Sequence, residues 1–285
     1  MNSPAALAGA GVARRPPALA VERDELHLWT LRQPWTDGGA RAMLTSELDD
    51  AERTRAASFL RPYDRLLYVA SHIALRRVLA AYVGSDPAEL VLARAACPEC
   101  GGPHGRPYVA ATPPAPVHFS LSHSHGLALI GVSAAPVGVD VERIPTAETS
   151  ELCLPTLHPA ERSELSELPA SEQPMAFGRL WTRKEAYLKG IGTGLKRDLA
   201  ADYLGGRSNP ADPRRPPGWI VSNVPGYPSH VAAVAVQAGT DQRMTARRVP
   251  MESLYTKDAE RGVELIASAK EHLSTVLPAG PDARA

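Results

Sequence analysis

The chain has 285 residues, enough for one large domain or two smaller ones, each with its own hydrophobic core. Hydrophobic residues make up 44% of it and charged residues 22%, as in ordinary globular proteins, and 31 basic residues balance 31 acidic ones. This balance excludes binding that depends on a large overall charge, so we expect no nucleic acid partner and no membrane partner. An anionic ligand must therefore meet a local cluster of positive side chains.

The sequence predicts a cytoplasmic protein. The apolar stretch at residues 5–13 precedes Arg14 and Arg15, whereas a secretory signal carries its positive charge first. The longest uncharged span, 117–139, is interrupted by Pro136 and favours strands over a membrane helix. The three cysteines, an odd number, fit a reducing compartment better than a disulfide framework.

The first part of the chain predicts a strand followed by two helices. Residues 1–20 are rich in Ala, Gly and Pro and are predicted to be disordered. Alternating polar and apolar residues predict a strand at 25–31. Helices are expected at 45–60, with Thr as the first residue, and at 63–83, where an apolar stripe runs to Gly84.

The second part of the chain mixes short strands with two helices. A loop rich in Cys, Gly and Pro is expected at 97–116. The predicted strands and helices follow from period-two and helical patterns. The strands are expected at 117–122, 127–133, 137–142, 218–224 and 229–236, and the helices at 159–168 and 173–188.

The order of these elements predicts two α/β units and a tail. The expected units are an N-terminal subdomain, 21–116, and a C-terminal subdomain, 117–242. In the tail, 243–285, an amphipathic helix ended by Pro278 is predicted from four apolar positions. These positions are Val263, Ile266, Leu273 and Leu277.

Two carboxylates lie within one predicted strand, in the sequence PVGVDVERI (136–144). Residues two apart on a strand share a face, so Asp140 and Glu142 point to one side while Val139 and Val141 point to the other. The valine face is typical of a core. The acidic face is suited to a cation.

A third acid, Glu185, occurs with Lys189 in LWTRKEAYLKGIGTGL (180–195). The two are four residues apart and share one face of the predicted helix, which is also the pattern of an ordinary surface ion pair. The sequence has five lysines, however, and two of them fall in this segment while a third, Lys196, follows it directly, next to three closely spaced glycines. Carboxylates suit Mg²⁺, and a lysine suits a phosphate, so the residues favour a site for a metal-bound diphosphate.

The segments FSLSHSHG, GVDVE and LWTRKEAYLKGIGTGL, in this order, resemble the signature of the Sfp-type 4′-phosphopantetheinyl transferases, over roughly 45–240. The resemblance implies an α+β fold of two similar α/β subdomains related by a pseudo-two-fold axis, with the active site in the cleft between them. It implies an enzyme that transfers the phosphopantetheine arm of coenzyme A to a serine of an acyl or peptidyl carrier protein, releasing adenosine 3′,5′-bisphosphate. Relatives of this length act as monomers.

The resemblance also implies roles for the acids and lysines. Asp140, Glu142 and Glu185 would bind Mg²⁺ on the pyrophosphate of coenzyme A, and Glu185 would accept the proton of the carrier serine, directly or through a metal-bound water. Lys189 would neutralise charge on the phosphates, assisted by Lys184.

Other residues match positions that contact the nucleotide. His123 matches a histidine near the 3′-phosphate, and Ser122 is expected to donate to the same nucleotide. Arg106 and Pro107 resemble a Gly-Lys/Arg-Pro segment beside the adenine. Three arginines near the first predicted helix resemble basic residues that meet the 3′-phosphate: Arg53, Arg55 and Arg61.

The sequence disfavours two other kinds of site. Cys97 and Cys100 with His104 have the spacing of half a zinc site, but a closed site needs four ligands and Cys153 is isolated, so a plain loop is favoured. A serine hydrolase site is disfavoured because no GxSxG elbow is present.

Two other functions remain as alternatives. One is a non-catalytic module on the same fold that binds coenzyme A and carrier proteins; the complete set of three acids and a lysine favours the enzyme. The other is a different Mg²⁺-dependent phosphoryl or nucleotidyl transferase, which the absence of a GxxxxGK[ST] loop disfavours.

Overall fold

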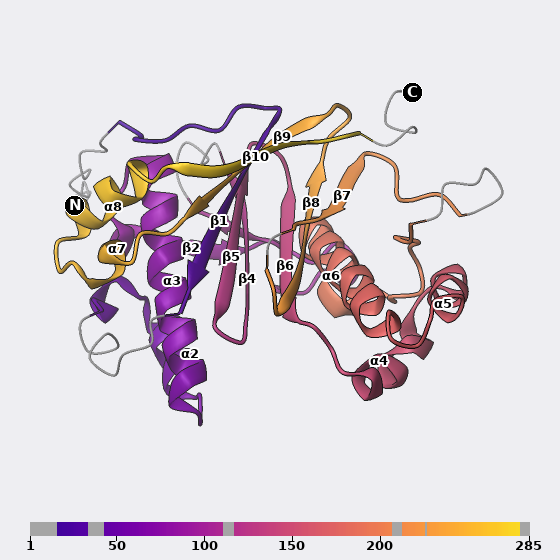
Figure 1. The fold of residues 1–285 in the computed structure, drawn as a ribbon. Helices are drawn as coiled ribbons and strands as arrows, with labels where there is room; N and C mark the ends of the chain where they lie inside the picture. Colours follow the sequence, from indigo (N-terminus) through magenta and orange to yellow (C-terminus); the bar gives the residue numbers. More distant parts are fainter. Residues whose placement is uncertain (1–15, 34–42, 111–116, 207–212, 226, 280–285) are drawn as a thin grey trace, which may run out of the picture.

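The computed structural model describes residues 16–33, 43–110, 117–206, 213–225 and 227–279. It has four layers, helix, sheet, sheet and helix (Figure 1). Helix α3 (Pro62–Val83) covers the outer face of a five-stranded sheet, and helix α6 (Gln173–Ile191) covers the outer face of a three-stranded sheet (Figure 1). The mixed α+β fold of two α/β subdomains is confirmed.

The five-stranded sheet has the order β10-β9-β1-β5-β4. Strand β1 (Glu25–Arg32) pairs antiparallel with β5 (Leu127–Ser133) and parallel with β9 (Gln242–Arg248). Strands β4 (His118–Ser124) and β10 (Glu271–Leu277) form the two edges. The sheet therefore combines strands from both ends of the chain.

The three-stranded sheet has the order β6-β8-β7 and is antiparallel. Its strands are β6 (Val137–Arg143), β8 (His230–Gln237) and β7 (Trp219–Asn223). Val139 and Val141 are fully buried in the core between the two sheets. Asp140, which lies between these two valines in the sequence, pairs in register with Ala233 and faces α6. The predicted separation of valines and acids onto opposite faces of the strand is confirmed.

Helix α3 forms the centre of the first subdomain. It begins at Pro62 and ends at Val83, and the next residue, Gly84, has a left-handed backbone (φ 67°) and stops the helix as predicted. It is long and apolar enough to cross a membrane, but 83% of its apolar window is buried inside the protein, as in a core helix.

Buried ion pairs connect the segment before α3 to this helix. The 3-10 helix η1 (Thr45–Glu47) and helix α2 (Asp50–Ala57) replace the single helix predicted at 45–60, because Asp49 caps α2. Arg76, on α3, is fully buried and donates to Glu52 at 2.7 Å and to Asp49 at 2.9 Å. These bonds fix α2, and the side chains it carries, against α3.

The tail differs from the predicted helix. Helices α7 (Glu252–Tyr255) and α8 (Ala259–Ala267) precede strand β10, which pairs antiparallel with β9. Leu273 and Leu277, four residues apart, share a face in a strand as well as in a helix, and both pack into the core between the sheets. Pairing with the free edge of β9 decides for the strand, so the prediction of helix at 271–277 is wrong.

The remaining elements are short, apart from α5. Strands β2 and β3, helix α4 and strands β9 and β10 were not predicted from the sequence. The elements not yet given are η2 (Pro87–Glu89), β2 (Leu92–Arg94), β3 (Pro107–Val109), α4 (Ala147–Cys153), η3 (Leu154–Thr156), α5 (Pro159–Ser166) and η4 (Gly194–Lys196).

The boundary predicted between the two subdomains, after residue 116, does not coincide with the division of the strands between the two sheets. Strands β4 and β5 follow residue 116, yet they pair with β1 and belong to the first sheet. The predicted disordered segment, 1–20, lies mostly outside the described residues. Its described end does not fit the prediction, because the backbone N–H groups of Ala18 and Leu19 donate to the carbonyl of Ala81.

Candidate active site

A cleft of about 720 Å³ lies where the two subdomains meet. Helices α2 and α3, the loop between β2 and β3, strands β4 and β6 and the end of α6 all contribute to its walls. Predicted site residues that line it are Arg55, Arg106, Pro107, Ser122, His123, Glu142 and Lys189.

Asp140 does not line the cleft and is 2% exposed, but it contacts Ser122 and Lys189, which do line it. Its Oδ1 atom accepts hydrogen bonds from Lys189 Nζ at 2.7 Å and from Ser122 Oγ at 2.9 Å. Within the described part of the chain, its Oδ2 atom is buried without a hydrogen-bond partner. A buried carboxylate oxygen in this condition is costly unless a cation or donor meets it.

Glu142 and Glu185 add two further carboxyl groups. Burial, and then the negative charge of Asp140, raises the pKa of both. The pKa of Glu185 reaches about 7, although Lys189 lowers it in part. One lysine therefore faces three acids, and the excess negative charge is what a divalent cation would neutralise.

The three carboxylates are close enough to influence one another but not drawn into a tight cluster. Among the described residues, their oxygens do not gather within 4.8 Å of one another. Lys189 Nζ is paired with Asp140, and the side chain of Lys189 is 30% exposed. The donor set, with one unpaired buried oxygen, fits Mg²⁺, which binds few carboxylates and retains water and phosphate oxygens.

Strand β4 holds this group through three serines. Ser120, Ser122 and Ser124 alternate along the strand and share one face. The N–H groups of Val139 and Val141 donate to the first two hydroxyls, and Ser124 Oγ donates to Glu142 at 2.8 Å. Ser122, predicted to contact a nucleotide, donates a hydrogen bond to Asp140 and accepts one from Lys189. The alternation SxSxS was the sequence signal for this role.

Arg106 brings positive charge to the opposite wall. Its NH1 atom is buried without a hydrogen-bond partner in the described residues, and burial lowers its pKa. Its side chain packs on Gly192 (φ 85°), at the end of α6, where an added Cβ would lie 2.8 Å from Arg106 Cγ. A glycine is therefore required for the close contact between this loop and α6.

His123 and Arg55 lie on the side of the cleft formed by the first subdomain. Burial, followed by the nearby charges of His72 and Lys189, lowers the pKa of His123 to about 4, and its ring meets Tyr68 edge-on at 6.1 Å. Arg55 is exposed, with its guanidinium 5.1 Å from the centre of the Phe59 ring. Sequence reasoning missed Glu52, Tyr68 and His72, which line the same side and carry no distinctive motif.

Two predicted phosphate ligands are not at the cleft. Lys184 is 2% exposed and is paired with Glu161 at 2.8 Å, because α6 directs it away from Lys189. It also donates to the carbonyls of Leu199 and Asp202, so its predicted role is replaced by a structural one. Arg61 precedes α3, is exposed and does not line the cleft.

Arg53, the third arginine near α2, does not line the cleft either. It pairs with Asp50 at 2.7 Å and donates to the carbonyl of Leu48. Of the three arginines, the structure therefore brings only Arg55 to the cleft among the described residues.

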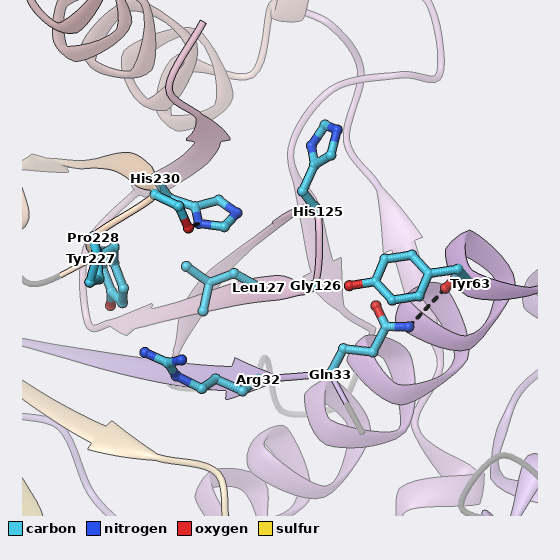
Figure 2. A pocket seen from close by; sticks show the side chains of 10 residues that line it. Arg32, Gln33, Tyr63, His125, Gly126, Leu127, Tyr227, Pro228 and His230 are labelled. Atoms are coloured by element: carbon cyan, nitrogen blue, oxygen red, sulfur yellow. Dashed lines mark hydrogen bonds between the residues drawn. The ribbon is translucent and has the colours of Figure 1, made fainter. Parts of the chain in front are cut away.

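A second cavity, of about 290 Å³, is lined in part by His125 and Gly126, the turn between β4 and β5. Figure 2 shows Leu127 between Arg32 and the side chain of His230, with Gln33 donating to the backbone carbonyl of Tyr63. His230 Nε2 also contacts the carbonyl of Ser124 at 3.1 Å. Ser124, which donates to Glu142, therefore links His230 to the acidic group of the main cleft.

Comparison with known proteins gives a consistent result. A family model described as the 4′-phosphopantetheinyl transferase superfamily matches residues 136–211. The 4′-phosphopantetheinyl transferase HetI of Nostoc is 30% identical over 225 residues, 78% of this chain and 92% of that protein. The chain belongs to the 4′-phosphopantetheinyl transferase family. A phosphopantetheinyl transferase of Thraustochytrium is 33% identical over 197 residues, 63% of each chain, and Sfp of Bacillus subtilis is 30% identical over 96 residues, 34% of this chain and 42% of Sfp.

The match to the 4′-phosphopantetheinyl transferase model coincides with the acidic part of the site. Residues 136–211 include β6 and α6, and therefore Asp140, Glu142, Glu185 and Lys189. The loop that carries Arg106 lies outside the matched segment. The family match thus includes Glu142 and Glu185, two carboxyl groups whose pKa is raised.

Proposed function

We propose that this member of the family transfers the 4′-phosphopantetheine arm of coenzyme A to a serine of an apo carrier protein and releases adenosine 3′,5′-bisphosphate. The observation that carries the proposal is the group of Asp140, Glu142, Glu185 and Lys189, of which Glu142 and Lys189 line the cleft and Asp140 is buried and paired with Lys189. A module that only binds coenzyme A has no need for a carboxyl group of raised pKa beside a lysine. The complete group therefore favours catalysis over the binding module.

Asp140, Glu142 and Glu185 would hold Mg²⁺, and the unpartnered Oδ2 atom of Asp140 supports this assignment. When bound, the ion would neutralise charge on the diphosphate of coenzyme A and orient it. Ser122 and Ser124 keep two of the acids in place through the hydrogen bonds described above. The serines therefore position the carboxylates.

Glu185 is the proposed proton acceptor. Burial and the neighbouring Asp140 raise the pKa of Glu185, which makes its carboxylate a stronger base than that of an ordinary glutamate. In this role it takes the hydroxyl proton of the carrier serine as the serine oxygen attacks the phosphorus atom. The bond between that phosphorus and the leaving bisphosphate breaks in the same displacement.

Lys189 is proposed to stabilise negative charge on the transferred and leaving phosphates. Its exposure at the cleft allows the ammonium group to move from Asp140 towards a bound phosphate. Arg106 supports a second anion-binding position, since its buried NH1 atom has an unused donor in the described residues. His123 and Arg55 would contact the nucleotide from the other wall.

The partners follow from the same proposal. We propose an acyl or peptidyl carrier protein as acceptor, a monomeric enzyme and a cytoplasmic location. Support for the location comes from the cysteine usage and from α3, whose apolar length serves the core.

The test is the intact mass of an apo carrier protein after incubation with this protein, coenzyme A and Mg²⁺. Transfer adds about 340 Da, the mass of one phosphopantetheine group. The gain should disappear with EDTA and with Asp140→Asn, and it should persist with Glu151→Gln, an exposed acid far from the cleft. No gain with carriers of fatty acid, polyketide and peptide synthases, while coenzyme A still binds, would support the binding module instead.

A further inference from the structure

The loop between β2 and β3 holds two cysteines and a histidine close together. The side-chain ligand atoms of Cys97, Cys100 and His104 lie within 4.8 Å of one another. Cys100 Sγ is 3.0 Å from His104 Nε2. Within the described residues, this is the group of three or more potential metal ligands that meets this distance. The loop therefore brings together three side chains of the kinds that bind zinc.

The backbone of the loop is folded around these side chains. The N–H of Gly101 donates to the carbonyl of Cys97 at 2.8 Å, and the N–H of Cys97 donates to the carbonyl of Gly102 at 2.8 Å. Gly101 has a left-handed backbone (φ 72°), which turns the chain directly after Cys100. Both hydrogen bonds close the turn and hold the two sulfur atoms on the same side.

The packing at Gly102 also brings the ligands together. A Cβ atom added there would lie 3.1 Å from His104 Cδ2 and 3.4 Å from Cys100 Sγ. The two side chains therefore pack over a position without a side chain. This arrangement leaves His104 and Cys100 facing each other above the turn.

The separations fit a tetrahedral metal ion. Zn–S bonds of about 2.3 Å and Zn–N bonds of about 2.0–2.1 Å place ligand atoms of a tetrahedral site roughly 3.5–3.8 Å apart. The observed cluster meets these values with shifts of about 1 Å or less. Two thiolates and an imidazole are ligands that zinc prefers over Mg²⁺.

We propose that Cys97, Cys100 and His104 bind one Zn²⁺ ion. The two cysteines bind as thiolates, giving up two protons to solvent, and His104 binds as neutral imidazole through Nε2. Cys100 is exposed, so the fourth position is open to a water molecule. A site with three protein ligands removes the need for the second Cys/His pair that the sequence lacks.

The position of this site gives it a structural effect on the cleft. His104 lines the cleft, and the loop runs from it directly into Gly105 and Arg106. The N–H of Ala95 donates to the carbonyl of Arg106, and the N–H of Gly105 donates to the carbonyl of Ala95, so the loop is closed at its base. Zinc at the far end would fix the loop at both ends. If the proposed function holds, the ion therefore positions Arg106 for coenzyme A.

The first test measures the metal itself, without coenzyme A or carrier. The full chain is purified under reducing conditions, stripped of metal with a chelator and titrated with Zn²⁺. Bound metal is then measured by inductively coupled plasma mass spectrometry. We expect one Zn²⁺ per chain. The same chain titrated with Co²⁺ should develop a sulfur-to-cobalt charge-transfer absorption, which Mg²⁺ at Asp140 cannot produce.

Variants separate the cluster from other sites. Cys100→Ser changes an exposed side chain and His104→Ala a partly exposed one, and each should weaken zinc binding by at least about 100-fold while circular dichroism stays unchanged. Cys153→Ser, a cysteine outside the cluster, is the matched control and should bind zinc normally. In the Cys153→Ser background, Zn²⁺ should protect the remaining thiols from alkylation.

Less than a tenth of one zinc ion per fully reduced chain would overturn the proposal, as would unchanged binding in both ligand variants.

A second readout then addresses the effect on the cleft. Stripping zinc should weaken coenzyme A binding by about tenfold in the native chain, but not in Arg106→Ala. If the native chain binds zinc but does not bind coenzyme A, the proposed function is wrong and the proposed metal site is still supported.

Discussion

Replacing Glu185 by glutamine should stabilise the metal-free protein while removing transfer. The pKa of Glu185 rises from 4.5 to about 7 through burial and through Asp140 and Glu142, so its ionised form destabilises the fold. At about 1.4 kcal/mol for each pH unit, the cost at pH 8 is about 3 kcal/mol. We expect a gain of about 1–3 kcal/mol for the variant, because part of this cost is repulsion that Glu185 shares with the neighbouring acids.

The sign depends on pH in a defined way. A carboxyl group with a raised folded-state pKa is protonated in the native protein below about 7, and stability is lost as pH rises from 4.5 through about 7. At pH 5 the cost falls to about 1 kcal/mol or less, so glutamine should gain little there.

The assay is urea unfolding of the native chain and Glu185→Gln in EDTA, at pH 5 and pH 8. Glu151→Gln, an exposed acid on α4, serves as the control and should change stability by less than about 0.5 kcal/mol at both pH values. Equal stability of Glu185→Gln and the native chain at pH 8, or an equal gain at both pH values, would refute the electrostatic reasoning.

The two lysines of α6 should separate stability from activity. Lys184→Met leaves Glu161 buried without its positively charged partner and should lower the free energy of unfolding by about 3–5 kcal/mol in urea melts. Lys189→Met should instead lower the transfer rate by about 100-fold or more with little change in the melt; the opposite pattern would reverse their roles. Arg106→Ala should weaken coenzyme A binding about 10- to 100-fold in calorimetry, and an unchanged affinity would remove it from the site. His123 should remain neutral at pH 5.5 in NMR titrations of the free protein, because burial and nearby positive charges lower its pKa to about 4; a midpoint near 6.5 would contradict this.

The sequence predicted the parts of the site that depend on regular periodicity. Asp140 and Glu142 share a face because strand β6 has a period of two, and Glu185 and Lys189 share one because α6 has a period of 3.6. The same geometry explains the error at Lys184. It lies five residues before Lys189, roughly 140° around the helix, and so enters the core beside Glu161.

The parts that the sequence could not predict depend on contacts between distant segments. Strand β10 forms because β9 offers it an edge, and β9 in turn lies beside β1, more than 200 residues earlier. The clustering of Cys97 with His104 required the turn at Gly101 and the packing at Gly102. Arg55 and Arg61 carry the same charge in similar surroundings, and only the course of α2 and α3 decides which reaches the cleft.

The return of the C-terminal segment to the first sheet sets an order on biosynthesis. Residues of β9 separate β1 from β10, and Arg77 of α3 donates to the carbonyls of Ser253 and Thr256. The first half of the protein therefore emerges from the ribosome long before β9 and β10, the strands that complete the five-stranded sheet. During translation the three-stranded sheet with α6 has all of its strands first, and the half made earliest finishes folding last.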